Sequence, residues 1–327
     1  MISKGIIIIP TQGFGNRLKM LASSIIFSNY YKIPLFVCWQ PTPDCNIKLE
    51  DILVKENNIN EISFDDVQKS SYCYFGQVHT NSIFDKISQV IEDPEHSYEY
   101  ILLEGGHEYK SPDIPRLQYL QLKKQFYNGL IFTEPIVQRI QSFRQDSNLN
   151  IDSKYIAIHY RDVDQKPDQK PDQGDIPNDP IVDFVTNSPI DSFFTIIDKI
   201  STEHPIVIIS NTDRFYTQFK TKYTNKFNIY TSGITNSDRD NTNDMLDSVV
   251  DFLILSRAEL IIGSYFSSFS DEASFFKIIP KITPLNGELI ENIMSTVNNY
   301  HCLNYSFIDN IAAVNFNDKI LIEYLHI

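Results

Sequence analysis

Three polar segments combine side-chain types that bind phosphate, and each follows a predicted strand. In the most informative one, the apolar strand ending at His159-Tyr160-Arg161 runs into a His-x-Arg-x-x-Asp cluster that closes at Asp164. Ligands bind at the carboxyl ends of strands in open α/β sheets, and a guanidinium fork grips two phosphate oxygens at once. The segment therefore predicts that Arg161 binds a diphosphate. The alternative is a structural arginine bracketed by a satisfied pair of His159 and Asp164.

The second segment is the glycine-containing loop Thr11–Leu18, which separates a strand from a helix. Gly13 and Gly15 would let the backbone approach a ligand and adopt positive φ angles, and the following helix start favours anions. Asn16 falls at the predicted cap position, and its alternative role is capping alone. The Gly-x-Gly-x-x-Gly dinucleotide pattern is incomplete here, so the loop on its own is a weak phosphate signal.

The third segment joins a helix, a buried strand and a serine-rich turn. Ser267 and Ser268 fall at a predicted helix start, where hydroxyls and free N–H groups form an anion nest. The alternative is N-capping, although four serines around one turn exceed what a cap needs. Asp251 is an acid on an otherwise apolar helix. It is either a solvated position beside Ser248 or a carboxylate that accepts from two N–H groups of a guanine edge.

Regular alternation of strands and helices places these segments. The strand Ile6–Pro10, a helix from Asn16 and the strand Pro34–Trp39 make a βαβ opening. From about residue 151 the alternation predicts a doubly wound parallel sheet. Its strands are expected at Tyr155–Tyr160, Pro205–Ser210, Phe227–Tyr230 and Leu260–Gly263, and its helices at Ile190–Ile200, Asp213–Tyr223, Asn243–Ser256 and from Ser268.

The length of 327 residues predicts two domains. We place them at 1–150 and 151–327, with the boundary in the polar stretch 145–152. The part from 44 to 96 has no clear pattern, and the chain after Pro280 either continues the second domain or packs back on the first.

Composition limits the classes of partner. The net charge of −14 and a pI of about 4.9 argue against nucleic acid or an anionic membrane as a bulk partner, because both need a basic surface. No apolar run reaches membrane-spanning length and no signal peptide is evident, so we expect a cytoplasmic protein. No Cys/His set has zinc spacing.

Together the three segments resemble the GDP-fucose-dependent fucosyltransferases, which include bacterial nodulation, core α1,6- and protein O-fucosyltransferases. Those families share a Gly-x-Gly-Asn-type loop, a His-x-Arg strand end and an Asp sixteen residues before a Ser-Ser-Phe turn. In this chain the places are filled by Gly13-Phe14-Gly15-Asn16, by His159-Tyr160-Arg161, and by Asp251 with Ser267-Ser268-Phe269. The resemblance covers the second half and the first ~55 residues, and most of 56–150 is unmatched.

The resemblance implies a GT-B glycosyltransferase, in which two Rossmann-like domains face a central cleft and the first binds the acceptor. It implies inverting transfer of fucose from GDP-fucose to a glycan or protein hydroxyl, with no metal and no cofactor besides the donor substrate. Arg161 would face the serine-rich helix start across the interdomain gap, and Arg161 and Asn16 would be catalytic. The implied donor-binding residues are Gly13, Phe14, Gly15, Asn16, His159, Arg161, Asp213, Asp251, Ser267, Ser268 and Phe269.

The base that takes the acceptor proton stays open. One set of candidates lies in the proline-rich tandem repeat 165–180, which is either a lid or a passive insertion: Asp168, Asp172 and Asp175. The other set follows the Gly105-Gly106 strand end: Glu104, His107 and Glu108. Two alternative functions also stay open, namely transfer from another nucleotide sugar and nucleotide-sugar binding without transfer.

Overall fold

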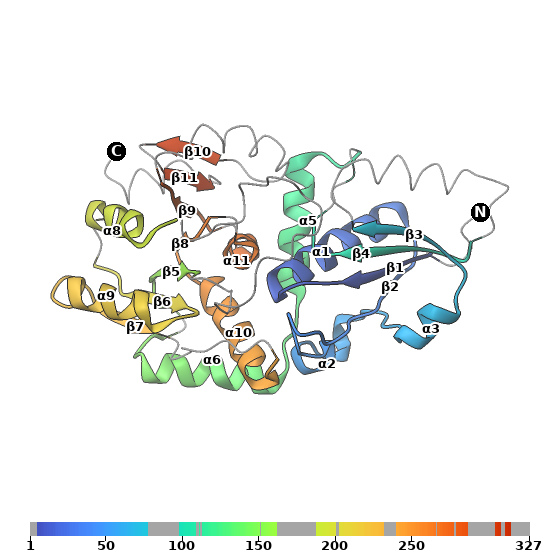
Figure 1. Cartoon of the computed structure of the whole chain (residues 1–327), viewed down its shortest axis with the longest axis horizontal. Helices are drawn as coiled ribbons and strands as arrows, with labels where there is room; N and C mark the ends of the chain where they lie inside the picture. The colour runs from blue at the N-terminus through green and yellow to red at the C-terminus, as the bar shows by residue number, and fades with distance from the viewer. Residues whose placement is uncertain are drawn as a thin grey trace, which may run out of the picture. The chain divides into compact units, whose positions relative to one another are not determined.

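The chain is described by a computed structural model in which two compact units each carry one sheet (Figure 1). One unit comprises Met1–Arg139 with Asp238–Val250, and the other comprises Ile140–Ser237 with Asp251–Ile327. Helix α10 (Thr242–Leu255) contributes residues to both. The residues described are 5–77, 98–108, 111, 113–150, 152–161, 188–200, 203–231, 240–265, 267–277, 279–286, 305–308 and 311–314.

The first unit is built on a parallel sheet with the strand order β2-β1-β4-β3. All residues of the central strand β1 are buried, as expected for a strand covered on both faces. The strands are β1 (Gly5–Pro10), β2 (Leu35–Val37), β3 (Tyr72–Gln77) and β4 (Tyr100–Gly105). The helices are α1 (Phe14–Tyr31), α2 (Leu49–Ile52), η1 (Lys55–Asn57), α3 (Phe64–Lys69), α5 (Arg116–Gly129) and the start of α6 (Glu134–Asp146).

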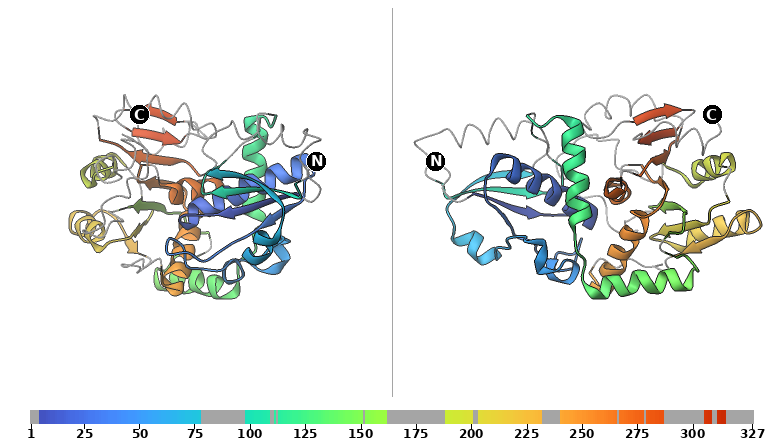
Figure 2. Two further views of the ribbon diagram at one scale, coloured as in Figure 1. Left: turned by 45° about the vertical axis from the view of Figure 1, so that its right-hand side comes forward. Right: turned by 180° about the vertical axis from the view of Figure 1, so that it is seen from behind.

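Helices cover the two faces of this sheet differently. Helix α1 connects β1 to β2 and packs against both β1 and α5, and Figures 1 and 2 show α1 and α5 side by side. On the other face, Val67 of α3 packs with Ile7, Ile9 and Leu102. The loop after β1 therefore leads from a fully buried strand into a helix that is anchored by a second helix.

The second unit has a seven-stranded sheet with the order β10-β11-β9-β8-β5-β6-β7. The predicted parallel sheet is confirmed from β7 to β9, because the pairs β7–β6, β6–β5, β5–β8 and β8–β9 are all parallel. The strands are β5 (Ile156–Tyr160), β6 (Ile206–Ser210), β7 (Ile229–Thr231), β8 (Leu260–Gly263), β9 (Lys281–Pro284), β10 (Tyr305–Ile308) and β11 (Ile311–Val314).

The chain after Pro280 extends this second sheet. β9 is parallel to β8, and the hairpin of β11 and β10 then adds two antiparallel strands at the edge. These strands therefore do not return to the first unit. The antiparallel edge was not predicted. A local sequence pattern can indicate a hairpin, but it does not indicate which strand of the sheet the hairpin pairs with.

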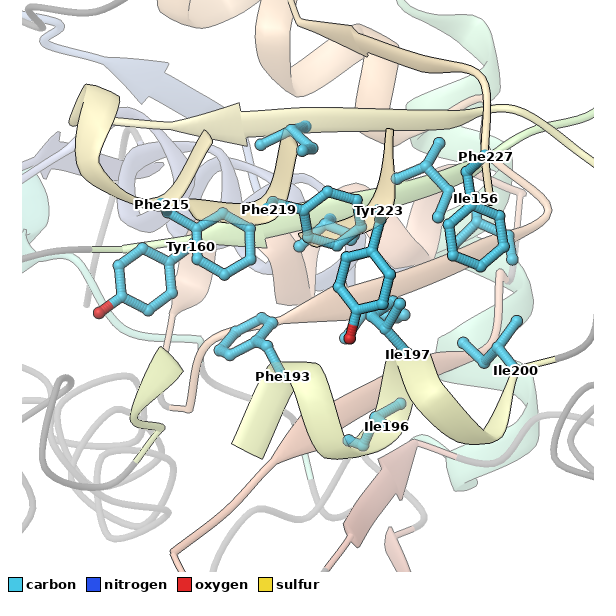
Figure 3. Close-up of a cluster of buried hydrophobic side chains, with 14 of the residues drawn as sticks. Ile156, Tyr160, Phe193, Ile196, Ile197, Ile200, Phe215, Phe219, Tyr223 and Phe227 are labelled. Carbon is cyan, nitrogen blue, oxygen red and sulfur yellow. The ribbon is translucent and has the colours of Figure 1, made fainter. Parts of the chain in front are cut away.

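Alternating residues of the sheet face opposite helix layers. Ile156, Ile158 and Tyr160 of β5 point into a core with α8 (Ile190–Lys199) and α9 (Asp213–Tyr223), shown in Figure 3. The Tyr160 ring stacks on Phe215 at 4.6 Å. Since successive strand residues alternate in direction, His159 points to the other face, where α10 and α11 (Ser268–Lys277) lie (Figure 2). This alternation separates the hydrophobic core of the unit from its polar strand ends.

Candidate functional site

The carboxyl ends of β5 and β8 are tied together by Ser264. The Ser264 N–H donates to the His159 carbonyl oxygen at 3.0 Å, and the Arg161 N–H donates to Ser264 Oγ at 2.8 Å. Ser264 is fully buried. The next residue, Tyr265, donates its N–H to Ser188 Oγ at 2.8 Å. These bonds fix the backbone at the point where two of the predicted phosphate-binding segments leave the sheet.

Aromatic stacking joins His159 to the serine-rich turn. The His159 ring stacks on Phe269 with a centroid distance of 5.2 Å and an interplanar angle of 28°. Phe269 also packs edge-on against Phe252 of α10 at 5.4 Å. His159 is 8% exposed, so its ring is part of the wall between β5, α10 and α11. Two of the three predicted phosphate-binding segments therefore meet in one unit.

Ser267 immediately precedes α11 and carries the most informative atom of this region. It is fully buried, and among the described residues its Oγ has no hydrogen-bond partner. Its carbonyl oxygen accepts from the Asp271 N–H at 3.0 Å, so the backbone begins the helix while the side chain does not cap it. Buried hydroxyls normally have partners. The capping alternative is therefore wrong for the Ser267 side chain.

The carboxylate of Asp251 lies on α10, one residue before Phe252. Asp251 is 5% exposed, so the alternative of a solvated position is wrong. A buried carboxylate is costly unless it has polar or charged partners. It directly precedes Phe252, whose ring contacts Phe269.

A buried lysine also contacts the residues of the serine-rich turn. Lys281 of β9 is 1% exposed; its Nζ pairs with the Asp271 carboxylate in the first turn of α11 and lies 3.4 Å from the Ser264 carbonyl oxygen. A Cβ at Gly263 would lie 2.7 Å from Lys281 Cε and 2.6 Å from Ser270 Oγ. Because Gly263 has no side chain, Lys281 has room to reach the first turn of α11.

Arg161 and Ser267 belong to the same unit, so the expectation that they face each other across an interdomain gap is wrong. Both follow neighbouring strands of one sheet, because β5 pairs with β8 from Ile156–Leu260 to His159–Gly263. The ends of adjacent parallel strands meet at one sheet edge. Arg161 is partly exposed.

The glycine-containing loop lies in the first unit and holds a strained residue. The positive φ angle falls on Gln12 (67°), whereas Gly13 has a φ of −68°. Our expectation that Gly13 supplies the positive φ is therefore wrong. A non-glycine residue in this region costs about 1–2 kcal/mol. A Cβ at Gly106, after β4, would lie 2.8 Å from Gln12 Oε1 and 2.9 Å from Asn16 Cβ, so Gly106 allows this close approach.

Arg17, which we did not predict, holds the Gln12 conformation. Its Nε donates to the Gln12 carbonyl oxygen at 2.9 Å, its Nη1 to the Gln40 carbonyl oxygen at 2.5 Å and its Nη2 to Thr42 Oγ1 at 2.6 Å. The guanidinium also lies 5.2 Å from the Trp39 ring. Arg17 is fully buried, and burial lowers its pKa. Its five-donor fork clamps the loop after β1 to the loop after β2.

Asn16 is not the helix cap. Helix α1 begins at Phe14 after the N-cap Gly13, which offers no side chain. Asn16 therefore lies in the first turn, and its Nδ2 donates to Gln12 Oε1 at 2.6 Å. Phe14 and Gly15 are buried. The amide of Asn16 is oriented by a residue four positions earlier, which the pattern of glycines did not reveal.

The structure separates the candidate bases. Glu104 Oε2 accepts from the Tyr74 hydroxyl at 2.7 Å, a bond that raises the pKa of Tyr74. Glu108 accepts from Lys123 Nζ at 2.7 Å and from the Tyr119 hydroxyl at 2.6 Å. Burial raises the pKa of Glu108, but the charge and hydrogen bond of Lys123 outweigh it and hold the pKa below the usual value. Glu108 is therefore a poor base.

The other predicted positions are less informative. Asp213 is exposed at the start of α9, and His107 is half-buried. Asp168, Asp172 and Asp175, with the whole repeat 165–180, lie outside the described residues. In the described part of the chain, no group of three or more His, Cys, Asp or Glu is placed to hold a metal ion. No described helix is both long and apolar enough to cross a membrane.

Comparisons with known proteins give a fold and no match in sequence. No protein-family model and no characterised protein matches the chain. NodZ α-1,6-fucosyltransferase soaked with GDP-fucose is similar with a TM-score of 0.57 at 13% identity, covering 86% of this chain and 95% of NodZ. A variant of Arabidopsis thaliana FUT1 in complex with GDP gives 0.57 at 13%, covering 86% and 70%. POFUT1 in complex with GDP gives 0.50 at 12%, covering 86% and 98%.

Each of these likenesses to three different fucosyltransferases covers 86% of the chain. The chain has the α/β fold that is shared by these GT-B fucosyltransferases.

Proposed function

We propose that the protein is an inverting glycosyltransferase that moves fucose from GDP-fucose to a hydroxyl group of a glycan or protein, without a metal ion. The observation that supports this most is the fold shared with NodZ and FUT1 over 86% of the chain. The geometry of the second unit agrees with it, because phosphate-binding groups gather at adjacent strand ends. The acceptor and its linkage are not part of the proposal.

The diphosphate is assigned to the ends of β5 and β8. Helix α11 has ten residues and begins directly after Ser267, so its free N–H groups favour an anion there. The buried Ser267 Oγ, which lacks a partner among the described residues, supplies a hydrogen bond that the folded chain leaves unmade. Arg161, whose N–H is fixed by Ser264, supplies positive charge at the neighbouring strand end.

The remaining donor contacts are assigned by the resemblance and by burial. Asp251 binds the guanine edge, since a buried carboxylate can accept from two adjacent N–H groups. His159 and Phe269 form a stacked wall of the pocket. Asn16, in the first unit, has its amide held by Gln12 and takes part in transfer, and Asp213 contributes to ribose or base.

The proposed reaction breaks the bond between fucose C1 and the β-phosphate oxygen ahead of attack. The electron pair leaves with GDP, while the acceptor oxygen bonds to C1 from the opposite face and its proton passes to a base. The diphosphate gains negative charge as the bond lengthens. Fixed N–H and cationic groups aimed at it therefore stabilise the transition state more than the ground state.

Two described residues remain as candidate bases. Glu104 lies in β4, and His107 follows Gly106, which packs closely against Gln12 and Asn16. Glu108 is set aside because Lys123 holds it as a carboxylate with a low pKa. The aspartates of the repeat stay in the proposal as alternatives.

The test is GDP binding by the full chain, measured by calorimetry and by the shift in melting temperature. Arg161→Ala and Asp251→Asn should each weaken GDP by roughly 10–100-fold, because a charged hydrogen bond contributes about 1.5–3 kcal/mol. Arg214→Ala and Asp146→Asn change exposed residues of the same types and should leave GDP binding unchanged. Equal GDP affinity in all four variants would show that these residues do not bind the nucleotide.

Turnover decides the donor and the chemistry. We expect hydrolysis or transfer with GDP-fucose to exceed that with UDP-glucose, and to persist in a chelator such as EDTA. A preference for the uridine donor would remove the guanine role of Asp251. A GDP complex without turnover on any acceptor glycan would instead favour a binding module.

A further inference from the structure

A groove on the first unit has a lining that suits a second, different ligand. It lies between the C-terminal half of α1, the turn at 57–60, the start of β2 and one face of α5, and has a volume of about 670 Å³. Pro34 and Leu35 border it where β2 begins. The Gln12 loop follows the opposite, carboxyl end of β1, so the groove is separate from the strand-end residues of this unit.

The lining is uncharged and rich in amides. No aspartate, glutamate, lysine or arginine lines the groove in the described part of the chain, although the whole chain has a net charge of −14. The polar lining is made of amide side chains and Ser28, whose hydroxyl donates to the Ile33 carbonyl oxygen, and two aromatic rings and several aliphatic side chains complete it. The members on which the argument depends are Asn29, Tyr30, Gln118, Gln125 and Phe126.

Several of these groups are available to a ligand. Asn29, Gln118 and Gln125 are exposed and form no side-chain hydrogen bond within the described part of the chain. Tyr30 is 41% exposed; its hydroxyl donates to the Asp113 carbonyl oxygen at 3.3 Å, and its ring packs against Tyr31 at 5.0 Å and 76°. The Phe126 ring is half-buried and packs on Tyr127 at 5.3 Å, so it presents a fixed surface.

The spacing of the lining residues along α5 places them on one face of the helix. Gln118, Leu122, Gln125, Phe126 and Gly129 line the groove, and positions three or four apart lie on one face of a helix. From the first to the last of them, the helix rises about 16 Å. Gly129 is exposed at the end of this face, where an added Cβ would meet no atom within 4 Å. The groove is therefore long enough for a chain of sugar rings.

The chemistry of the lining selects the class of ligand. Amides both donate and accept hydrogen bonds, and they can match hydroxyl and acetamido groups without the desolvation cost of a charge. Aromatic rings provide rigid apolar faces for the C–H faces of a sugar. A phosphate or nucleotide would find no cation in this lining. A neutral oligosaccharide satisfies all of these conditions.

We propose that this groove binds a neutral glycan, and that it holds the part of the acceptor distant from the reacting hydroxyl. The second half of this statement rests on the proposed function. The groove is then a specificity site that does not touch the nucleotide. Substitutions there change the affinity for the acceptor and leave the affinity for GDP as it was.

The experiment measures binding of neutral linear oligosaccharides of N-acetylglucosamine, glucose and mannose to the full chain by calorimetry, with a sulfated oligosaccharide as the charged comparison. At least one neutral probe should bind, and the sulfated probe should not. Gln125→Ala and Phe126→Ala should each weaken the neutral probe by about tenfold, or about 1.4 kcal/mol. Leu122→Glu, which puts a charge into the groove, should weaken it at least as much.

The matched control is Gln121→Ala. Gln121 is an exposed glutamine on the same helix, one turn before Gln125 and outside the groove, so its variant should bind the neutral probe as the wild type does. The melting temperature of each variant without ligand shows whether Phe126→Ala alters folding, and Gln125→Ala carries the test if it does.

Other results would overturn the inference. One is that no neutral probe binds. Another is that Gln125→Ala and Gln121→Ala bind the neutral probe with equal affinity. A third is that a second copy of the chain occupies the groove, seen as a dimer that Leu122→Glu dissociates. GDP binding is measured in the same samples. If the wild-type chain binds a neutral glycan but not GDP, the result counts against the proposed function alone. If it binds GDP but no neutral glycan, the result counts against the groove alone.

Discussion

The loop after β1 in the first unit and the loop after β8 in the second follow the same strand–loop–helix plan but satisfy their polar groups differently. In the first, Arg17 and Asn16 occupy the carbonyl and side-chain oxygens of Gln12, and the arginine also binds the loop after β2. In the second, Ser267 Oγ is buried with no partner among the described residues. The first loop is complete as folded, whereas the second has a hydrogen bond left to make.

This difference separates scaffold from binding site. A buried polar group without a partner costs folding free energy, so a chain retains it where a ligand supplies the missing bond. A strained residue such as Gln12 persists because surrounding bonds hold it. The comparison therefore predicts that substitutions of Arg17 and Gln12 should act mainly on stability, and that substitution of Ser267 should act mainly on ligand affinity.

The strongest way to break this comparison is Arg17→Ala. The change leaves a cavity and removes three hydrogen bonds to Gln12, Gln40 and Thr42. We expect the free energy of unfolding to fall by about 4 kcal/mol, measured by urea denaturation. Arg214→Ala, at an exposed position of the second unit, should change it by less than about 0.5 kcal/mol. A loss near 1 kcal/mol for Arg17→Ala would mean that the first loop is not the rigid scaffold described here.

The second test concerns the ion pair that follows the neighbouring strand β4. Glu108→Gln should destabilise the protein by about 3 kcal/mol at pH 7, because it leaves the fully buried Lys123 without its counter-ion. The pKa of Glu108 is lower in the folded state. Its contribution is therefore complete above the unfolded pKa of about 4.3 and is lost as the pH falls through the folded pKa.

The measurement is the difference in unfolding free energy between wild type and Glu108→Gln as a function of pH. This difference should be constant above about pH 5 and shrink as the pH falls below about 4. Lys222→Met removes the exposed pair with Asp198, and it should change the free energy of unfolding far less than Glu108→Gln does. A pH-independent difference for Glu108→Gln would contradict the lowered pKa.

Two serines of the loop after β8, Ser264 and Ser267, allow the comparison to be made within one loop. Ser264→Ala removes the acceptor of the Arg161 N–H and should cost about 1–2 kcal/mol of stability. Ser267→Ala removes a hydroxyl with no described partner, so stability should stay within about 0.5 kcal/mol. Its GDP affinity should nevertheless fall by roughly 10–100-fold. Unchanged GDP affinity in Ser267→Ala would leave the buried hydroxyl without a ligand and remove the contrast.

Much of the second unit could be predicted from the sequence because its elements are periodic and apolar. Helix α9 and strand β8 have the predicted bounds, and α11 begins at the predicted Ser268. Helix α5 was missed because its buried face includes the charged Lys123, and strand β3 because it is a partly exposed edge strand.

For the candidate site, the sequence could predict only the features that lie within a single segment of the chain. Local patterns singled out Ser267 and Asp251, and both residues are buried in the structure, while their roles stay predictions. The roles of Arg17 and Lys281 depend on partners at Gln40, Thr42 and Asp271, which no local pattern connects to them. The scarcity of arginine, 8 of the 28 basic residues, was a signal that applied to Arg17 as well as to Arg161.

The smallest effect measures the bond that orients Asn16. Gln12 and Lys32 both have positive φ angles, 67° and 56°, and Lys32 is an exposed helix C-cap. Lys32→Gly should therefore stabilise the protein by about 1 kcal/mol, by relieving the left-handed backbone. Gln12→Gly gains the same relief but loses the 2.6 Å bond from Asn16 Nδ2, so its net change in unfolding free energy should be near zero. The difference between the two variants, about 1 kcal/mol, is the contribution of the Gln12–Asn16 bond. Equal stabilisation in both would mean that Gln12 does not hold Asn16, and the first loop would then be less complete than its hydrogen bonds indicate.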